Sequence, residues 1–184
     1  MNDMNPRSAV LVAAAFTMFV TGLAASASRT PQAKPAGKVD PAIMNKSVGE
    51  MTSEEEGQFS DAAEATIERV CIACHPFENI IKTRRTVREW NDQVLVMKGR
   101  GAPGTDPDFV TIKKYLIRYY GIVRVNAATT EELTSVLGLS PKAASAVVEY
   151  RTAHGRIPDV DTFLRIDGVD KAKIEEQPEA LRFD

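Results

Sequence analysis

The chain has 184 residues and a formal net charge of −2 at pH 7. This length fits one ordinary domain or two small ones. A net charge so close to zero does not by itself indicate a protein that binds nucleic acid or an anionic membrane surface.

Residues 1–27 are predicted to be an export signal. Arg7 precedes an almost unbroken apolar run over residues 9–25, and Ala25-Ser26-Ala27 is a small-x-small cleavage site. These are the three parts of a secretory signal peptide. An uncleaved membrane anchor is the alternative, since the run is about the minimum length that spans a bilayer. Either reading predicts an exported, periplasmic protein.

Residues 28–52 are predicted to be a flexible linker. The segment contains three prolines and shows no apolar periodicity. Such a composition is typical of an extended tether between folded parts.

Residues 53–121 are predicted to form a small domain of three helices. The first helix begins with Glu54–Glu56, which the helix macrodipole favours. The second opens with a capping box at Thr86, and the third ends at Gly121. A core this small is marginal alone, and this favours a buried cofactor that adds apolar mass.

Both cysteines and one of the two histidines fall within five residues, as Cys71, Cys74 and His75. The C-x-x-C-H spacing is typical of haem attachment, in which two thiols add to the vinyl groups and the histidine ligates the iron. A structural zinc site would need four ligands, and only His154 remains elsewhere. A redox-active C-x-x-C pair would be expected in a βαβ context, which is missing here. We therefore expect one covalently attached haem c with its iron.

The distal iron ligand is predicted to be Met97. It is the only methionine of this module after the motif, and it shares one helix face with Trp90 and Val94. A methionine on such a face is ordinarily a core residue, but this face would contact the haem. His154 or an open position are the alternatives.

Two arginines just past the motif, Arg84 and Arg85, are candidates to pair with the haem propionates. Surface ion pairs explain them equally well. Residues 82–118 carry nine bases and four acids, which is a candidate basic rim for an acidic redox partner. Solvated helix faces are the alternative.

This module resembles the small cytochrome c domains found in, or alongside, periplasmic quinohaemoprotein and sulfite dehydrogenases, through CIACH, IIKTRRTVREWNDQVLVMKGRGAP and IKKYLIRYYG. The resemblance covers residues 63–121. It implies thioethers at the two cysteines, His75 as proximal ligand and Met97 as distal ligand. Some relatives have a second methionine in the glycine loop, where this chain has Gly101-Ala102.

Residues 122–184 contain two similar units, each a helix, a tight turn and a second helix. The turns are LGLSPKAA and DGVDKAKI, at residues 137–144 and 167–174. This segment resembles the paired helix-hairpin-helix domain of competence-type extracellular DNA-binding proteins. The same hairpins occur without DNA in extrinsic subunits of photosynthetic complexes.

Two features of this segment disfavour DNA as a partner. The family's turn is Gly-hydrophobic-Gly, whose backbone N–H groups can hold a phosphate, but here Ser140 and Asp170 replace the second glycine. The segment also carries eight Lys and Arg against eleven Asp and Glu, a net charge of 8 − 11 = −3. Phosphate contacts supply most non-specific DNA affinity, so protein docking is favoured.

The sequence thus predicts an all-α, exported protein in which a cytochrome c-like domain precedes a paired helix-hairpin-helix domain. We expect a monohaem c-type cytochrome that performs outer-sphere electron transfer and docks to a membrane-associated redox complex. We expect no small-molecule substrate and no enzymatic turnover; peroxidase-like activity is a third hypothesis. The alternative is an envelope DNA-binding or uptake protein that carries a haem as stabiliser or redox sensor.

Overall fold

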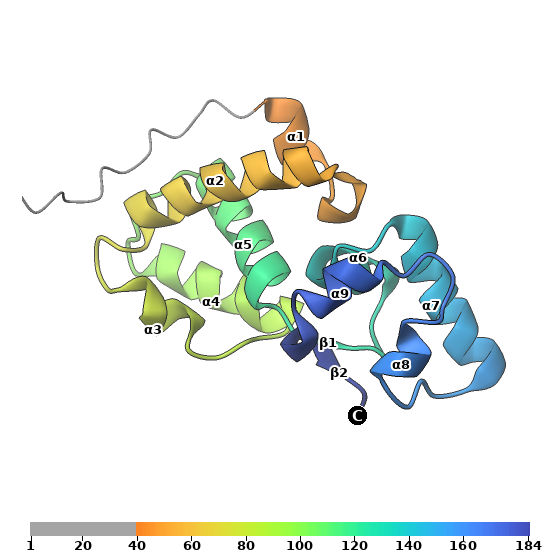
Figure 1. Cartoon of the computed structure of the whole chain (residues 1–184). Coiled ribbons are helices and arrows are strands. Elements are labelled where there is room, and N and C mark those ends of the chain that lie inside the picture. The colour runs from red at the N-terminus through yellow and green to blue at the C-terminus, as the bar shows by residue number, and fades with distance from the viewer. Residues whose placement is uncertain (1–39) are drawn as a thin grey trace, which may run out of the picture. The chain divides into compact units, whose positions relative to one another are not determined.

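The computed structural model describes residues 40–184 (Figure 1). Residues 1–39, with the predicted signal or anchor and the first part of the predicted linker, lie outside the described residues. All described elements belong to one compact unit.

The described chain is mostly helical with two short strands, which confirms the predicted all-α fold class at this coarse level. The elements are α1 (Pro41–Asn45), the 3₁₀ helix η1 (Val48–Glu50), α2 (Ser53–Val70), α3 (Phe77–Ile81), α4 (Val87–Gly99), α5 (Asp106–Tyr120), β1 (Val123–Arg124), α6 (Thr130–Leu137), α7 (Pro141–His154), α8 (Val160–Phe163), α9 (Lys171–Glu175), the 3₁₀ helix η2 (Pro178–Ala180) and β2 (Leu181–Arg182). Over residues 40–184, no helix combines the length and apolar character needed to cross a bilayer.

Local sequence sets where the longer helices begin. Four of them start at a threonine whose Oγ accepts the N–H three residues on, while the carboxylate at that residue accepts the threonine N–H. The pairs are Thr52 and Glu55 for α2, Thr86 and Glu89 for α4, Thr105 and Asp108 for α5, and Thr129 and Glu132 for α6. Each capping box satisfies two N–H groups that the helix leaves free.

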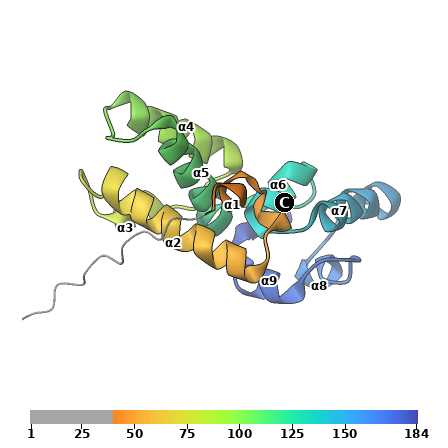
Figure 2. The same cartoon turned by 90° about the horizontal axis from the view of Figure 1, so that it is seen from above.

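Helix α5 lies between α2 and α4 and packs against both (Figures 1 and 2). Its apolar face, with Ile112 and Leu116, meets Phe59 and Ile67 of α2 and Trp90 of α4, and all five side chains are buried. These are the three helices that the sequence predicts for residues 53–121. The short helix α3 is an addition. Helix α2 ends at Val70, so the C-x-x-C-H motif follows this helix, whereas the sequence pattern predicts that the helix continues through the motif.

Two helix-hairpin-helix units follow, α6–α7 and α8–α9, as the sequence predicts. Their turns contain Gly138 at φ 66° and Gly168 at φ 78°, the left-handed region that favours glycine. The turns are neighbours, because a Cβ on Gly168 would lie 3.4 Å from the Cβ of Ala143 at the start of α7. Strands β1 and β2 pair in parallel and join the two ends of this segment.

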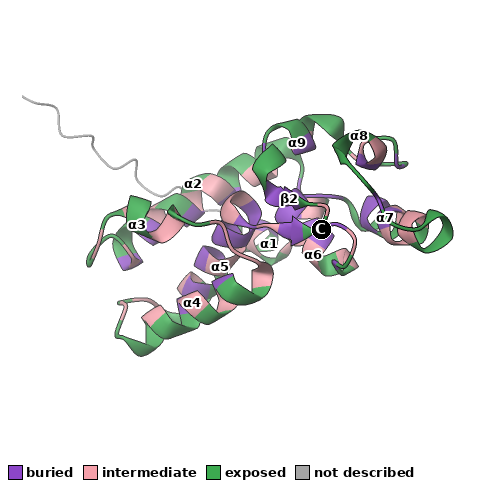
Figure 3. Cartoon of the chain, turned by 90° about the horizontal axis from the view of Figure 1, so that it is seen from below, coloured by how far each residue is buried: buried purple, intermediate pink, exposed green. Residues whose placement is uncertain are grey.

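The predicted boundary at residues 121 and 122 coincides with the end of α5, yet the core continues across it. Helix α5 packs on α6, and the buried apolar side chains form one cluster from α2 to β2. Figure 3 shows buried residues on α5 and at β2. The two sequence modules therefore share one hydrophobic core.

An ion pair with a buried arginine lies where these modules meet. The guanidinium of Arg118, at the end of α5, is 2.8 Å from a carboxylate oxygen of Glu56 on α2, and its side chain is 4% exposed. Arg118 also donates to the carbonyl of Val136 on α6 at 3.3 Å. The second carboxylate oxygen of Glu56 lies 3.6 Å from Lys173 Nζ on α9. The Glu56 carboxylate thus connects α2 to α5 and α9, and Arg118 extends this contact to α6.

The structure differs from the predicted linker over residues 40–52, which are folded. Ile43, Val48 and Met51 are buried, although their spacing matches neither a helix nor a strand over a longer run. Gly49 lies against the first hairpin, where a Cβ would be 1.9 Å from the carbonyl oxygen of Leu139. Tertiary contacts order this proline-containing segment, and periodicity alone does not reveal them.

We expect Gly49→Ala to destabilise the fold by about 1–3 kcal/mol, because the methyl group would overlap the Leu139 carbonyl and force a backbone shift. Urea unfolding followed by circular dichroism measures this. Gly57→Ala is the matched control, since nothing lies within 4 Å of a Cβ at this α2 position. It should stabilise by about 0.5–1 kcal/mol through helix propensity. Equal effects of the two substitutions would contradict the packing of η1 on the hairpin.

Candidate functional site

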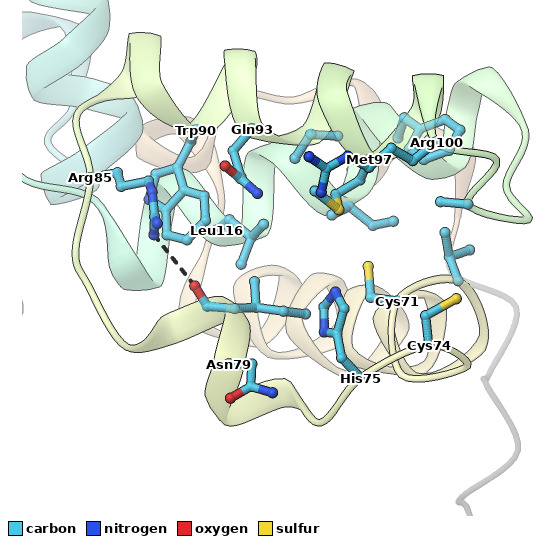
Figure 4. A pocket seen from close by; sticks show the side chains of 16 residues that line it. Cys71, Cys74, His75, Asn79, Arg85, Trp90, Gln93, Met97, Arg100 and Leu116 are labelled. Carbon is cyan, nitrogen blue, oxygen red and sulfur yellow. Dashed lines mark hydrogen bonds between the residues drawn. The ribbon is translucent and has the colours of Figure 1, made fainter.

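A cavity of about 410 Å³ opens between α2, α3, α4 and α5 (Figure 4). This volume falls in the range of small-molecule and cofactor sites, roughly 300–1,000 Å³. The lining is largely apolar and comprises Val70, Cys71, Cys74, His75, Asn79, Ile80, Arg85, Trp90, Gln93, Val94, Met97, Arg100, Ala102, Phe109, Ile112 and Leu116.

One wall is the C-x-x-C-H motif in the turn after α2. Cys71 caps α2 through its N–H, which donates to the carbonyl of Ile67 at 2.7 Å. The chain then turns, and His75 Nδ1 lies 3.4 Å from the carbonyl oxygen of Pro76. This contact suits an Nδ1–H tautomer, which leaves the lone pair of Nε2 free for a ligand. In Figure 4 the side chains of Cys71, Cys74 and His75 point toward α4.

The facing wall is α4, which carries Trp90 and Met97 (Figure 4). Trp90 is fully buried, and its Nε1–H donates to the carbonyl of Tyr120 at 2.9 Å. The Arg85 guanidinium lies 4.9 Å from the centre of the Trp90 ring and donates to the carbonyl of Thr83 at 2.8 Å. The indole N–H is thus already bonded, while Arg85 keeps free donors at the pocket.

The structure brings six of the seven predicted site residues to this pocket. The exception is Arg84, which forms an ion pair with Glu179 and donates to the carbonyl of Tyr119 at 3.0 Å. Arg84 therefore joins the two modules and does not line the cavity. His154, the alternative distal ligand, ends α7 and stacks on Tyr150, outside the cavity lining.

Sequence reasoning missed three polar residues of the lining, Asn79, Gln93 and Arg100. Gln93 and Arg100 lie three and ten residues after Trp90, so helical periodicity could have placed them on the Trp90 face. Asn79 lies on α3, a helix of five residues that is too short for a periodic signal.

The two cysteines differ in environment, although neither forms a disulfide. Burial raises the pKa of the Cys71 thiol, and the neighbouring Cys74 raises it further. Cys74 is exposed. Within residues 40–184, no group of three or more His, Cys, Asp or Glu is arranged to hold a metal ion.

A second candidate surface is formed by the helix starts that follow the two hairpins. At α7 the neutral Ser140 caps the helix, its Oγ accepting the N–H of Ala143 at 3.2 Å, and Lys142 is exposed beside it. At α9 the charged Asp170 is the cap, and its Oδ1 accepts the N–H of Ala172 at 3.0 Å. The two hairpins thus offer different electrostatic environments to an anion.

Comparison with known proteins identifies the second module. The helix-hairpin-helix motif family matches residues 120–182. The chain is 32% identical over 62 residues to an uncharacterized protein of Haemophilus influenzae, covering 33% of this chain and 55% of that protein. It is 32% identical over 54 residues to ComE operon protein 1 of Bacillus subtilis, covering 29% and 26%.

Endonuclease/exonuclease/phosphatase family domain-containing protein 1 of Mus musculus is 44% identical over 50 residues, 27% of this chain and 9% of that protein. The chain thus spans between 9% and 55% of the length of these relatives. No solved structure matches the chain. Residues 120–182 therefore form a helix-hairpin-helix domain, as the sequence predicts.

These findings overturn the predicted main function. Electron transport by a cytochrome docked to a redox complex is wrong, because the family match and the ComE operon relative point to DNA binding. The comparisons give no support to a cytochrome c domain, to haem or to iron. The sequence-based preference for a redox partner over DNA is therefore also wrong. DNA as a partner was the sequence-based alternative.

The difference between the two thiols predicts selective alkylation. When residues 28–184 are produced in a reducing cytoplasm, iodoacetamide at pH 8 should modify Cys74 at least about threefold faster than Cys71, because the thiolate is the nucleophile and burial disfavours it. Mass spectrometry of timed samples measures both rates, and Cys71→Ala and Cys74→Ala assign the peptides. Faster modification of Cys71 would contradict its half-buried position.

Proposed function

We propose that this chain binds double-stranded DNA through its helix-hairpin-helix domain. The observation that carries the proposal is the family match over residues 120–182, together with two hairpins whose glycines adopt left-handed backbone angles. Such turns present backbone N–H groups at a helix start, where a DNA phosphate can be held. The resemblance to ComE operon protein 1 supports the same role.

The first hairpin is the better phosphate site. Helix α7 has 14 residues and places partial positive charge at its start, beside the exposed Lys142. Its cap, Ser140, is neutral and repels no anion. At the second hairpin the Asp170 carboxylate already occupies the N–H groups of Ala172 and Lys173. A phosphate is therefore expected at α7, with the second hairpin contributing less.

The net charge of −3 is compatible with this surface because it says nothing about where the charges lie. Several of the acids serve local contacts in the fold. Glu132 and Asp159 cap α6 and α8, Glu175 pairs with Lys171, and Glu179 pairs with Arg84. A DNA contact depends on the charges facing the duplex, and a whole-segment sum averages over the other faces.

We expect Lys142→Ala to weaken duplex binding about threefold to tenfold and to lower the slope of log K against log salt by about 0.9, because one phosphate contact is lost. Asp170→Asn should strengthen binding, since the amide keeps the cap but removes a negative charge. Fluorescence anisotropy with a labelled 20-bp duplex and the full chain, at several salt concentrations, measures both.

Lys82→Ala is the matched control, because Lys82 is exposed and lies outside the helix-hairpin-helix domain. It should change affinity less than twofold. The weak end of non-specific DNA affinity is a Kd of about 10⁻⁴ M. If the wild-type chain shows no salt-dependent binding with a Kd below this value, the proposed function is refuted.

We further propose that the pocket holds a covalently attached haem, as the C-x-x-C-H motif predicts. The pocket fits the group in two respects: the motif forms one wall, and the facing helix presents a methionine. Cys71 and Cys74 would hold it by thioethers, with His75 and Met97 as candidate iron ligands and Arg85 as candidate propionate partner. Trp90 would pack against it as a buried wall.

When bound, a haem supplies apolar mass and a redox-active iron. The residues around it keep this space dry: Val94, Phe109, Ile112 and Leu116 are buried and line the cavity. We assign the group the role of stabiliser, because it would fill the space that separates the motif from α4. The protein then needs no substrate turnover, and export through residues 1–27 would bring it to the compartment where such thioethers form.

The haem assignment predicts that the protein stays coloured. Protein produced with its export signal in cells that attach haem c should keep its colour through denaturation and acid-acetone extraction, because thioethers survive where iron coordination does not. The double variant Cys71→Ala, Cys74→Ala should release all colour to the solvent. Release from the wild-type protein would contradict the assignment and leave the DNA proposal untouched.

A further inference from the structure

Two arginines lie opposite each other on the small parallel sheet. The register pairs Val123 with Leu181 and Arg124 with Arg182. In both strands the first residue is buried and the second is exposed. Side chains alternate between the two faces of a strand. The side chains of Arg124 and Arg182 therefore lie on the same, exposed face of the sheet, on strands about 4.8 Å apart.

This arrangement is unfavourable without an anion, since like charges directly opposite in a sheet repel. Arg124 has one carboxylate partner in the structure, Asp184, at 3.4 Å, and the two side chains are 65% and 61% exposed. Exposed pairs of this kind contribute little, about 0–1 kcal/mol. Arg182 donates to the carbonyls of Glu179 and Leu181, at 2.8 Å and 2.7 Å, and these contacts leave its charge uncompensated.

Two further arginines border the same chain segment, residues 179–184. Arg156 donates to the carbonyl of Phe183, while the charge of Arg84 is compensated by its ion pair with Glu179. We name the other three residues, Arg124, Arg156 and Arg182, the C-terminal arginine patch. Against its three positive charges the segment sets the carboxylate of Asp184, because that of Glu179 is paired with Arg84. The patch is therefore locally basic within a domain of negative net charge.

We infer that the C-terminal arginine patch contacts the phosphate backbone of DNA, as a surface additional to the two hairpins. The inference rests on the proposed DNA binding. A guanidinium matches a phosphate by two parallel hydrogen bonds and is weakly hydrated, so a phosphate can replace Asp184 at Arg124. One phosphate near Arg124 and Arg182 would also remove their mutual repulsion. Such contacts are independent of base sequence.

The test uses the full chain, a labelled 20-bp duplex and anisotropy at several salt concentrations. Arg124→Gln and Arg182→Gln keep a polar side chain but remove its charge. Each should weaken binding about threefold to tenfold and lower the slope of log K against log salt by about 0.9. Asp184→Asn should strengthen binding about twofold or more, because it removes the anion that competes with phosphate at Arg124.

Arg88→Gln is the matched control for the loss of one positive charge. Arg88 is 91% exposed on α4, and its carboxylate contact is Asp92 at 3.9 Å. It should change affinity less than twofold. If Arg124→Gln and Arg182→Gln behave like Arg88→Gln while Lys142→Ala weakens binding, the patch inference is overturned and the proposed function stands.

Two other outcomes also overturn the inference. Failure of the wild-type chain to bind the duplex removes the proposed function and the patch together. Binding to vesicles of phosphatidylglycerol that depends on Arg124 and Arg182, with no such dependence for DNA, would assign the patch to a lipid surface. Circular dichroism of each variant confirms that these exposed substitutions leave the fold intact.

Discussion

The ion pair between the half-buried carboxylate of Glu56 and the buried guanidinium of Arg118 is the constraint on which the arrangement of the described residues depends. The carboxylate compensates Arg118, whose side chain is 4% exposed, and lies 3.6 Å from the Lys173 ammonium. Arg118 in turn donates to the carbonyl of Val136, one residue before the last residue of α6. A buried charge without its partner costs several kcal/mol, about 3–5 when one member of a buried pair is removed. The pair therefore fixes how α2 and α5 meet the first hairpin.

Local chemistry made much of this fold predictable. The capping box at Thr86 begins α4 where the sequence indicates, α5 ends at the predicted Gly121, and Gly138 and Gly168 mark both hairpins through backbone angles that other residues rarely adopt. The central residues of the pocket lining were predictable for the same reason. Cys71, Cys74 and His75 are adjacent in sequence, and Met97 shares a helix face with Trp90.

What the sequence did not reveal depends on contacts between distant segments. The order of residues 40–52 comes from packing on α6 and the hairpin, with Gly49 against Leu139. Arg84 follows the motif closely enough to suggest a propionate partner, yet its charge is used by Glu179, ninety-five residues later in the chain. The net charge of residues 122–184 argued wrongly against DNA for a related reason. It counts carboxylates that cap helices, such as Glu132, together with those that could face a ligand.

Helix α5 contacts both the pocket and the first hairpin within one compact unit. Phe109, Ile112 and Leu116 line the pocket, and Arg118, two residues beyond Leu116, reaches the hairpin, where a Cβ on Gly138 would lie 3.2 Å from its guanidinium. Helix α2 likewise extends from Cys71 at one end to Glu56 near the other. A cut at Gly121 would separate Arg118 from Val136 and Glu56 from Lys173, although the sequence pattern changes there. The two modules are thus distinct in sequence but joined by buried charge, and each is best studied within the full chain.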